Sequence, residues 1–160
     1  AAVDVLGTPM WRLDVVRGEE RETVLADVVT GEVRRPLSRD EATAMAVASF
    51  SPDVAVTAVD SIVPDDIGLH HEYRGGELPA FRVEFDHGSG TRVYVSAAGA
   101  RVVTHRNARW RIFDFLWMLH TMDYRGRDDF NTVQIKTVSV AALLMAISGY
   151  WLFARTRKRR

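Results

Sequence analysis

Hydrophobic and polar positions near the start of the chain alternate in short blocks. Residues 11–35, WRLDVVRGEERETVLADVVTGEVRR, predict two strands around the polar turn RGEERE, followed by a tight turn at TGE. Ser38 and Glu41 have the S-x-x-E spacing of a capping box, and Pro52 stops further helix. With Ala, Met and Val filling the turns between, the pattern predicts a helix over residues 39–50.

The next block is rich in β-branched and alternating apolar residues. It predicts further strands, over residues 54–63, 78–85 and 91–96. The block also repeats the first one. WRLDV at 11–15 and FRVEF at 81–85 have the same class of residue at each position. The later segment VVTGEV corresponds to SAAGARV, with Gly31 matching Gly99. Each unit is therefore expected to be an antiparallel hairpin closed by a glycine turn. A helix is visible only before the second unit, so the helix of the first is expected upstream of residue 1.

Apolar positions concentrate at the C-terminal end. Residues 133–154, VQIKTVSVAALLMAISGYWLFA, contain Lys136 as their only charge. A helix of this length matches a hydrocarbon layer of roughly 30 Å. The segment is therefore predicted to be a transmembrane helix.

Charge is segregated along the chain although the net charge is zero. The segment that ends at Asp129 contains all 21 Asp and Glu and 15 Arg, so its net charge is −6. Lys136 and the tail RTRKRR at 155–160 together carry a charge of +6. By the positive-inside rule the tail is cytoplasmic and the acidic part lies outside. A basic tail could also indicate nucleic-acid binding, but beside a span it is more simply a topology signal that attracts anionic lipid headgroups. We therefore expect a lipid bilayer as partner and no nucleic acid.

An aromatic segment, RWRIFDFLWMLHTMDYRGRDDFN at 109–131, precedes the span. Read as a helix over 110–124 it reaches about 22 Å, too short to cross a bilayer. Trp and Tyr favour the headgroup region, so an amphipathic helix at the membrane interface is expected, with simple completion of the domain core as the alternative. The predicted interface or interaction residues are Trp110, Phe113, Trp117, His120, Asp123, Tyr124, Tyr150 and Trp151.

Small residues form a stripe along the predicted span. Ser139, Ala142, Ala146 and Gly149 recur at spacings of three and four, which lets another helix approach closely in lipid. The alternative is that Ala is simply common in spans. A helix-packing face is therefore a hypothesis for these four residues.

The polar residues offer little catalytic chemistry. The chain has no cysteine, and its five histidines show no H-x-x-x-H or H-E-x-x-H spacing, so no metal, cofactor or small-molecule substrate is expected. His120 and Asp123, three residues apart, could form an imidazole–carboxylate pair of structural or catalytic use. With no nucleophile elbow or phosphate-binding loop, the sequence favours a protein that is not an enzyme.

The turn sequences VLADVVTGEV (24–33) and, more loosely, RVYVSAAGARVV (92–103) resemble the PepSY domain, with Ser96 in place of the usual Asp. Together with the WMLHTMDY segment and the span, the chain is similar to a group of bacterial membrane proteins with PepSY domains, which usually carry a further span ahead of the domain. The resemblance implies an α+β fold with two PepSY-like units over 1–108, the first lacking its helix, then the juxtamembrane segment and one transmembrane helix.

The resemblance also implies a function. PepSY domains occur in protease propeptides as inhibitors and folding aids, so we expect a non-catalytic inner-membrane protein whose periplasmic domain binds or modulates an envelope protein or peptidase. The alternative is an accessory subunit or fragment of an electron-transfer system such as a siderophore-iron reductase. Such reductases hold haem through histidines in their spans, and residues 133–154 contain no histidine. This segment could not supply those ligands.

Overall fold

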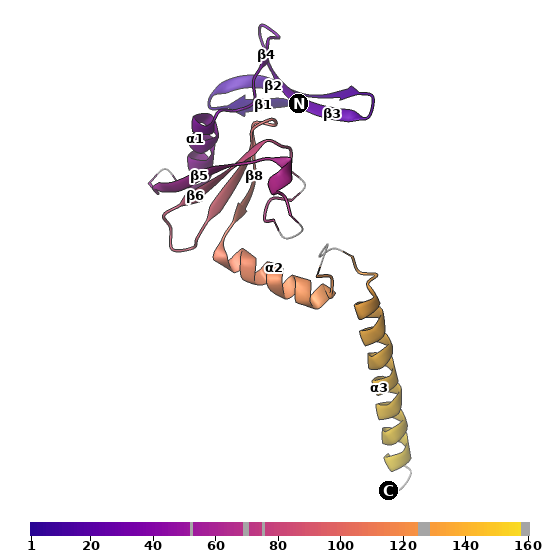
Figure 1. The fold of residues 1–160 in the computed structure, drawn as a ribbon. Helices are drawn as coiled ribbons and strands as arrows, with labels where there is room; N and C mark the ends of the chain where they lie inside the picture. Colours follow the sequence, from indigo (N-terminus) through magenta and orange to yellow (C-terminus); the bar gives the residue numbers. More distant parts are fainter. Residues whose placement is uncertain (52, 69–70, 75, 125–128, 158–160) are drawn as a thin grey trace. The chain divides into compact units, whose positions relative to one another are not determined.

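A computed structural model describes residues 1–51, 53–68, 71–74, 76–124 and 129–157. The fold is α+β, as predicted, with two four-stranded antiparallel sheets (Figure 1). The chain divides into two compact units, Ala1–Arg111 and Ile112–Arg160. Residues 125–128 of the predicted juxtamembrane segment and residues 158–160 of the predicted basic tail lie outside the described residues.

The first sheet has the order β1-β2-β3-β4, and every neighbouring pair is antiparallel. Its strands are β1 (Ala2–Val5), β2 (Thr8–Arg17), β3 (Glu20–Asp27) and β4 (Val33–Arg34). The sequence pattern did not predict β1, because four residues are too few to show alternation. Its turn into β2 has positive φ at Leu6 (53°) and Gly7 (86°), which is the backbone of a type I′ hairpin turn.

The second sheet repeats this arrangement with the order β5-β6-β7-β8. Its strands are β5 (Val56–Ile62), β6 (Ala80–Phe85), β7 (Arg92–Ser96) and β8 (Arg101–Arg106), and a short 3₁₀ helix, η1 (Pro64–Asp66), follows β5. The predicted strands therefore agree with the structure to within two residues at each end, while β8 is a further strand in the segment after the glycine turn.

Helix α1 (Arg39–Phe50) has the predicted bounds. The Ser38 hydroxyl accepts a hydrogen bond from the Glu41 backbone N–H, and the Glu41 carboxylate accepts one from the Ser38 backbone N–H, which confirms the capping box. The helix packs on one face of the second sheet and buries Ala42 and Ala46 completely. Small side chains at this spacing let the helix backbone lie close to the strands.

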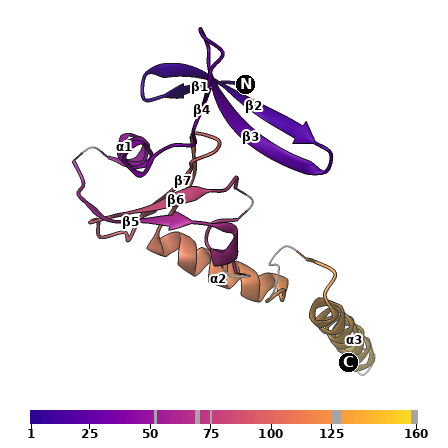
Figure 2. The same cartoon turned by 45° about the horizontal axis from the view of Figure 1, so that its top comes forward.

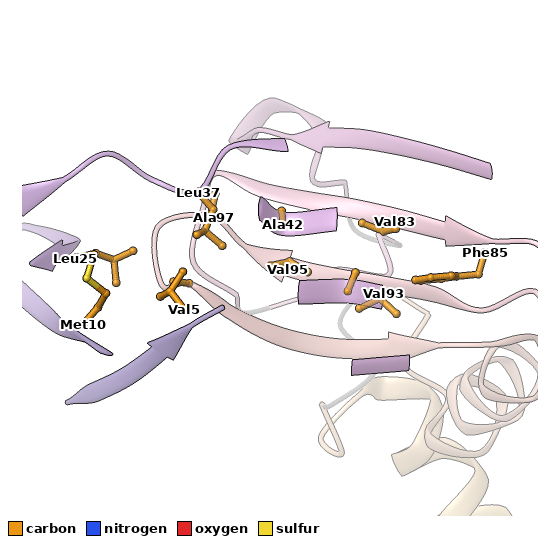
Figure 3. Packing of buried hydrophobic residues seen from close by; sticks show 12 residues of the cluster. Val5, Met10, Leu25, Leu37, Ala42, Val83, Phe85, Val93, Val95 and Ala97 are labelled. Atoms are coloured by element: carbon orange, nitrogen blue, oxygen red, sulfur yellow. The ribbon is translucent and has the colours of Figure 1, made fainter. Parts of the chain in front are cut away.

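One apolar cluster links the two sheets (Figure 3). Val5, Met10 and Leu25 contribute from the first sheet, and the central residues of β6 and β7 contribute from the second. The backbone N–H of Leu37 donates to the carbonyl oxygen of Ala97 at 2.9 Å, which joins the chain between the units to the turn after β7. The two repeats therefore share a core.

Strand pairing supports the internal repeat. Trp11 lies opposite Ala26 in the first sheet, and Phe81 lies opposite Val95 in the second. The next pair on each sheet is Leu13 with Val24 and Val83 with Val93. Residues matched by sequence therefore occupy matching register positions.

The C-terminal part of the chain is helical. Helix α2 (Ala108–Thr121) begins in the first compact unit, and α3 (Val133–Arg157) belongs to the second. By length and composition α3 is apolar enough to cross a membrane, and none of its residues is buried. Its 25 residues correspond to about 37 Å of helix, sufficient for a hydrocarbon layer of roughly 30 Å.

Candidate functional site

The first turn of α2 is held to the second sheet by Glu72. Its carboxylate accepts hydrogen bonds from Arg111, Nε to Oε1 at 2.6 Å and Nη2 to Oε2 at 3.3 Å, and from the Tyr94 hydroxyl at 2.9 Å. Arg111 also donates from Nη1 to the Gly90 carbonyl oxygen at 3.0 Å. Two parallel N–H···O bonds fix direction as well as distance. The start of α2 therefore has a set orientation on the N-terminal unit.

A chain of ion pairs continues from Glu72 across the sheet face opposite α1. Arg92 contacts Glu72 at 3.4 Å and Glu84 at 2.8 Å. Arg82 contacts the same Glu84 at 3.4 Å and Asp60 at 2.7 Å. Pairs that share partners restrain each other's side chains, so this network ties β5, β6 and β7 to the start of α2 more firmly than isolated surface pairs would.

The electrostatics of the network keep Glu72 ionised. Its burial acts to raise the pKa of the carboxyl, but the hydrogen bonds from Arg111 and Tyr94 and the nearby guanidinium charges outweigh burial and leave the pKa below its usual value. The hydrogen bond to Glu72 is also the main reason that the pKa of Arg111 is raised. The pair is therefore charged at neutral pH.

A layer of two tyrosines lies beside this network. Tyr73 is fully buried, stacks on Tyr94 with ring centroids 5.7 Å apart, and donates its hydroxyl to the Glu77 carbonyl oxygen at 2.6 Å. Burial is the main cause that raises the pKa of Tyr73 to about 12, and it likewise raises the pKa of Tyr94. Both phenols stay neutral, so they act here as packing and hydrogen-bonding groups.

A cleft of about 690 Å³ lies on the N-terminal unit between the two repeats. Three of its described lining residues are acidic, and the rest are apolar or uncharged: Asp14, Val16, Glu22, Thr23, Pro36, Glu77, Leu78, Pro79 and Ala98. Carboxylates beside proline, leucine and valine side chains can bind a segment that carries both basic and apolar groups.

The two turn glycines have different roles. Gly31 has φ +71° and open space around it, and its turn is closed by Asp27, whose carboxylate accepts from the backbone N–H of Val29 and Thr30 at 2.8 and 2.7 Å. These two hydrogen bonds lower the pKa of Asp27, with the bond from Thr30 contributing most. In the second turn Ser96 takes the place of the aspartate, and its hydroxyl accepts from the Gly99 N–H at 2.9 Å.

Gly99 is not in the left-handed region, where Ala100 is found instead with φ 45°. A Cβ at Gly99 would overlap the carboxylate of Glu77 and lie 3.1 Å from the Ser96 hydroxyl. Glycine is therefore favoured at position 99 because a larger side chain would collide with its neighbours. At position 31 it is favoured because the backbone has a positive φ.

The predicted interface residues of α2 fall into two groups. The ring of Trp110 lies under the Arg106 guanidinium at 3.8 Å, within the N-terminal unit. Phe113 and Trp117 stack with ring centroids 6.1 Å apart, and Trp117 also contacts the rings of His120 at 6.1 Å and Phe130 at 6.2 Å. Trp110 is thus packed by its own domain, whereas the second group forms a separate aromatic cluster.

The helix prediction over residues 110–124 is wrong at its end. Helix α2 stops at Thr121, and Met122 has φ 53°, so Asp123 and Tyr124 do not continue its face. The Asp123 carboxylate accepts from the backbone N–H of Asp129 at 3.1 Å, and Asp123 is buried. The helical spacing expected to pair it with His120 therefore does not apply, because the chain turns between them.

The predicted residues of the span all lie on α3. Ser139, Ala142, Ala146 and Gly149 share one stripe of the helix, and Tyr150 and Trp151 lie near its C-terminal end with their side chains exposed. The Arg155 guanidinium lies 5.2 Å from the Trp151 ring.

No group of three His, Asp or Glu that could hold a metal ion occurs among the described residues. The histidines have separate surroundings: His71 Nδ1 accepts from the Tyr73 N–H, His87 contacts the Ser89 hydroxyl, and His105 contacts the Ser49 hydroxyl of α1. His70 lies outside the described residues. These three histidines therefore lie at separate places in the fold, each beside a different polar group.

Sequence reasoning missed the Glu72 network. Glu72 and Arg111 are 39 residues apart in unrelated local patterns, HHEYR and RWRI, and no spacing rule connects them.

Comparisons with protein-family models, with curated proteins and with solved structures found no match for this chain.

Proposed function

We propose that this chain is a non-catalytic, membrane-anchored protein of PepSY type in a bacterial inner membrane. Its N-terminal domain lies in the periplasm, its C-terminus in the cytoplasm, and the domain binds or modulates a protein partner such as an envelope protein or peptidase. The apolar length of α3 supports the anchor, and the switch from net −6 to +6 along the chain supports the orientation. The family assignment rests on the two turn sequences and on the repeat.

The observation that carries partner binding is the acidic cleft between the repeats. Asp14 and Glu22 reach it from the first sheet, and Glu77 reaches it from the loop before β6. A polypeptide segment with Lys or Arg side chains complements these carboxylates, while Leu78 and Pro79 offer apolar contact. The cleft lies on the same compact unit as the Glu72–Arg111 pair, which orients the start of α2 on that unit.

Photo-cross-linking in cells tests partner binding. A photoreactive phenylalanine at Val16, which lines the cleft, is compared with one at Val29, which is 90% exposed in the turn after β3. We expect a discrete adduct of one mass from position 16 and none from position 29. Asp14→Lys combined with Glu22→Lys should remove the adduct.

Equal adducts from both positions, or an adduct that survives the charge reversal, would contradict the cleft as the binding surface. Membrane anchoring is tested separately by carbonate extraction. The chain should remain in the membrane pellet, and a chain ending before Val133 should be released. Release of both chains would contradict the anchor.

A further inference from the structure

The outer edge of β3 is open for part of its length. Strands β2 and β3 pair in one register along the whole of β3, whereas β4 pairs with Leu25 and Ala26 near its end. Figure 2 shows the β2–β3 hairpin continuing well beyond β4. Within the part of the chain that the structure describes, no strand pairs with the outer edge of residues 20–24. This stretch of β3 is therefore an edge strand.

The edge is open because the chain leaves β3 soon after β4. Pro36, two residues beyond β4, has no backbone N–H to donate. The backbone N–H of Leu37 then donates to the carbonyl oxygen of Ala97 in the second repeat. The chain thus turns towards the second sheet and does not extend β4 along β3.

The open edge presents backbone donors and acceptors. Alternate residues of an antiparallel strand direct their N–H and C=O groups to opposite edges. The Asp27 N–H donates to the Glu32 carbonyl oxygen at 2.9 Å, on the β4 side. By alternation Leu25, Thr23 and Arg21 direct their backbone groups to that side as well. Leu25 pairs with β4, so the backbone groups of Thr23 and Arg21 are left to face outward.

The acidic cleft reaches this edge. Its lining includes Glu22 and Thr23, consecutive residues whose side chains point to opposite faces of β3. From β2 it includes Asp14 and Val16, which share one face. A cleft lined by both faces of β3 and by one face of β2 passes round the outer edge of β3. Pro36, just after β4, lines it on the same side.

The edge strands of the second sheet are less suited to accept a strand. The pairing of β5 with β6 shifts register after Val56, and that of β7 with β8 shifts after Tyr94. The Arg39 guanidinium also donates to the Val59 carbonyl oxygen of β5 at 2.7 Å. Irregular pairing and charged side chains at an edge oppose the addition of another strand. The regular edge of β3 is therefore the better acceptor.

We propose that the partner segment binds as an added strand on the outer edge of β3, with Lys or Arg at alternate positions and apolar residues between them. Side chains on the cleft side of such a strand meet Asp14 and Glu77, with Leu78 beside them, and those on the other side lie next to Val24. Backbone hydrogen bonds hold the segment, and the carboxylates select its basic groups. This inference rests on the proposed binding of a partner in the cleft and specifies the conformation and chemistry of the bound segment.

Peptide binding to the full chain in detergent micelles tests the proposal. The probe is a fluorescein-labelled octapeptide in which lysine and valine alternate, and fluorescence anisotropy follows its binding. The control peptide has glutamate in place of lysine. We expect the lysine peptide to bind at least about tenfold more tightly than the glutamate peptide. Asp14→Lys combined with Glu22→Lys should remove this preference.

Backbone pairing is tested first on the peptide. N-methylation removes an amide N–H, and two versions of the lysine peptide carry N-methyl groups on one or the other alternating set of amides. Only one set can face β3 in an added strand. One version should therefore bind about tenfold more weakly, or worse, and the other should bind like the parent peptide. This comparison does not rely on the folding of any protein variant.

Backbone pairing is tested next on β3. Thr23→Pro removes an outward N–H, whereas Thr23→Val keeps it, and both variants lose the hydroxyl that donates to Asp14 at 3.0 Å. Thr23→Pro should bind the lysine peptide about tenfold more weakly than Thr23→Val. Amide exchange of the unsubstituted chain should also slow at Arg21 and Thr23 when the peptide binds, and change little at Glu22 and Val24, which already pair with β2.

Different failures would overturn different claims. Equal binding of the two N-methylated peptides and of the two Thr23 variants would refute strand addition, while a preference for lysine that the charge reversal removes would leave partner binding in the cleft intact. A lysine peptide that does not bind, with the cross-link at Val16 still formed in cells, would refute the stated chemistry of the segment alone. Loss of that cross-link as well would contradict the proposed function. Slower exchange at Thr23 that grows with protein concentration, without peptide, would make the occupant a second copy of this chain and refute the inference.

Discussion

Glu72 and Arg111 are joined side chain to side chain by two hydrogen bonds of 2.6 and 3.3 Å, although 39 residues separate them. The pair lies where the N-terminal unit meets the first turn of α2. Because the Tyr94 hydroxyl also donates to Glu72, the carboxylate holds two elements at once. Removal of the carboxylate should therefore weaken the packing of both the first turn of α2 and strand β7.

Replacing Glu72 with alanine should lower the free energy of unfolding by about 2 kcal/mol, because it leaves two partly buried donors without an acceptor. The measurement is urea denaturation of the full chain in detergent micelles. Arg111→Lys keeps the charge but loses the two-point geometry and should cost less. Arg109→Ala, at an exposed position of the same turn, is the matched control. An equal loss from Arg109→Ala would contradict a specific role for the pair.

Glu41 should make stability depend on acid pH. The hydrogen bond from Arg34 at 2.6 Å, with that from the Ser38 backbone, lowers the pKa of Glu41 from 4.5 to about 2. A lowered carboxyl pKa stabilises the fold above pH 4.5, and this contribution is lost as the pH falls from 4.5 towards 2.

Glu41→Gln should therefore reduce the free energy of unfolding at pH 7 by on the order of 1 kcal/mol, a value discounted for solvent screening of a partly exposed pair. Wild type and variant should converge near pH 2. Denaturation curves between pH 2 and 7 measure the difference. A difference that is constant across this range would show that the carboxylate's charge is not the cause.

The two turn glycines should respond differently to alanine. Gly31→Ala should cost about 1 kcal/mol, because φ +71° is strained for a residue with a Cβ, and Gly31→Asn should cost less. Gly99→Ala should instead destabilise by displacing the Glu77 carboxylate. Combining it with Glu77→Ala should therefore recover most of the loss. Additive losses in the double variant would contradict the steric explanation.

Trp117 should contact lipid, whereas Trp11 should not. The chain has four tryptophans, so variants that keep one and replace the others with phenylalanine isolate each signal. In vesicles with brominated acyl chains, we expect quenching of Trp151 in the span and of Trp117 in α2, and none of Trp11. Quenching of Trp151 without Trp117 would reject interfacial docking of the aromatic segment and favour the alternative that it completes the domain core.

Several features follow from the sequence because their signals are local. The bounds of α1 depend on the Ser38–Glu41 box at one end and Pro52 after the other, all within fifteen residues. The potential of α3 to span a membrane depends only on how many consecutive residues are apolar. The repeat was visible because matched strands keep the same alternation of side chains.

Other features were decided only by tertiary contacts. No local pattern marks β1, which is a strand because β2 lies beside it, and none stops α2 at Thr121 rather than at Tyr124. The acidic cleft and the Glu72 network likewise join segments that are far apart along the chain. Periodicity and capping act within a few turns of backbone, whereas hydrogen bonds, ion pairs and packing join whichever residues the fold brings within a few ångströms. The sequence alone therefore determined the kinds of element and their order, and the tertiary structure decided which side chains meet.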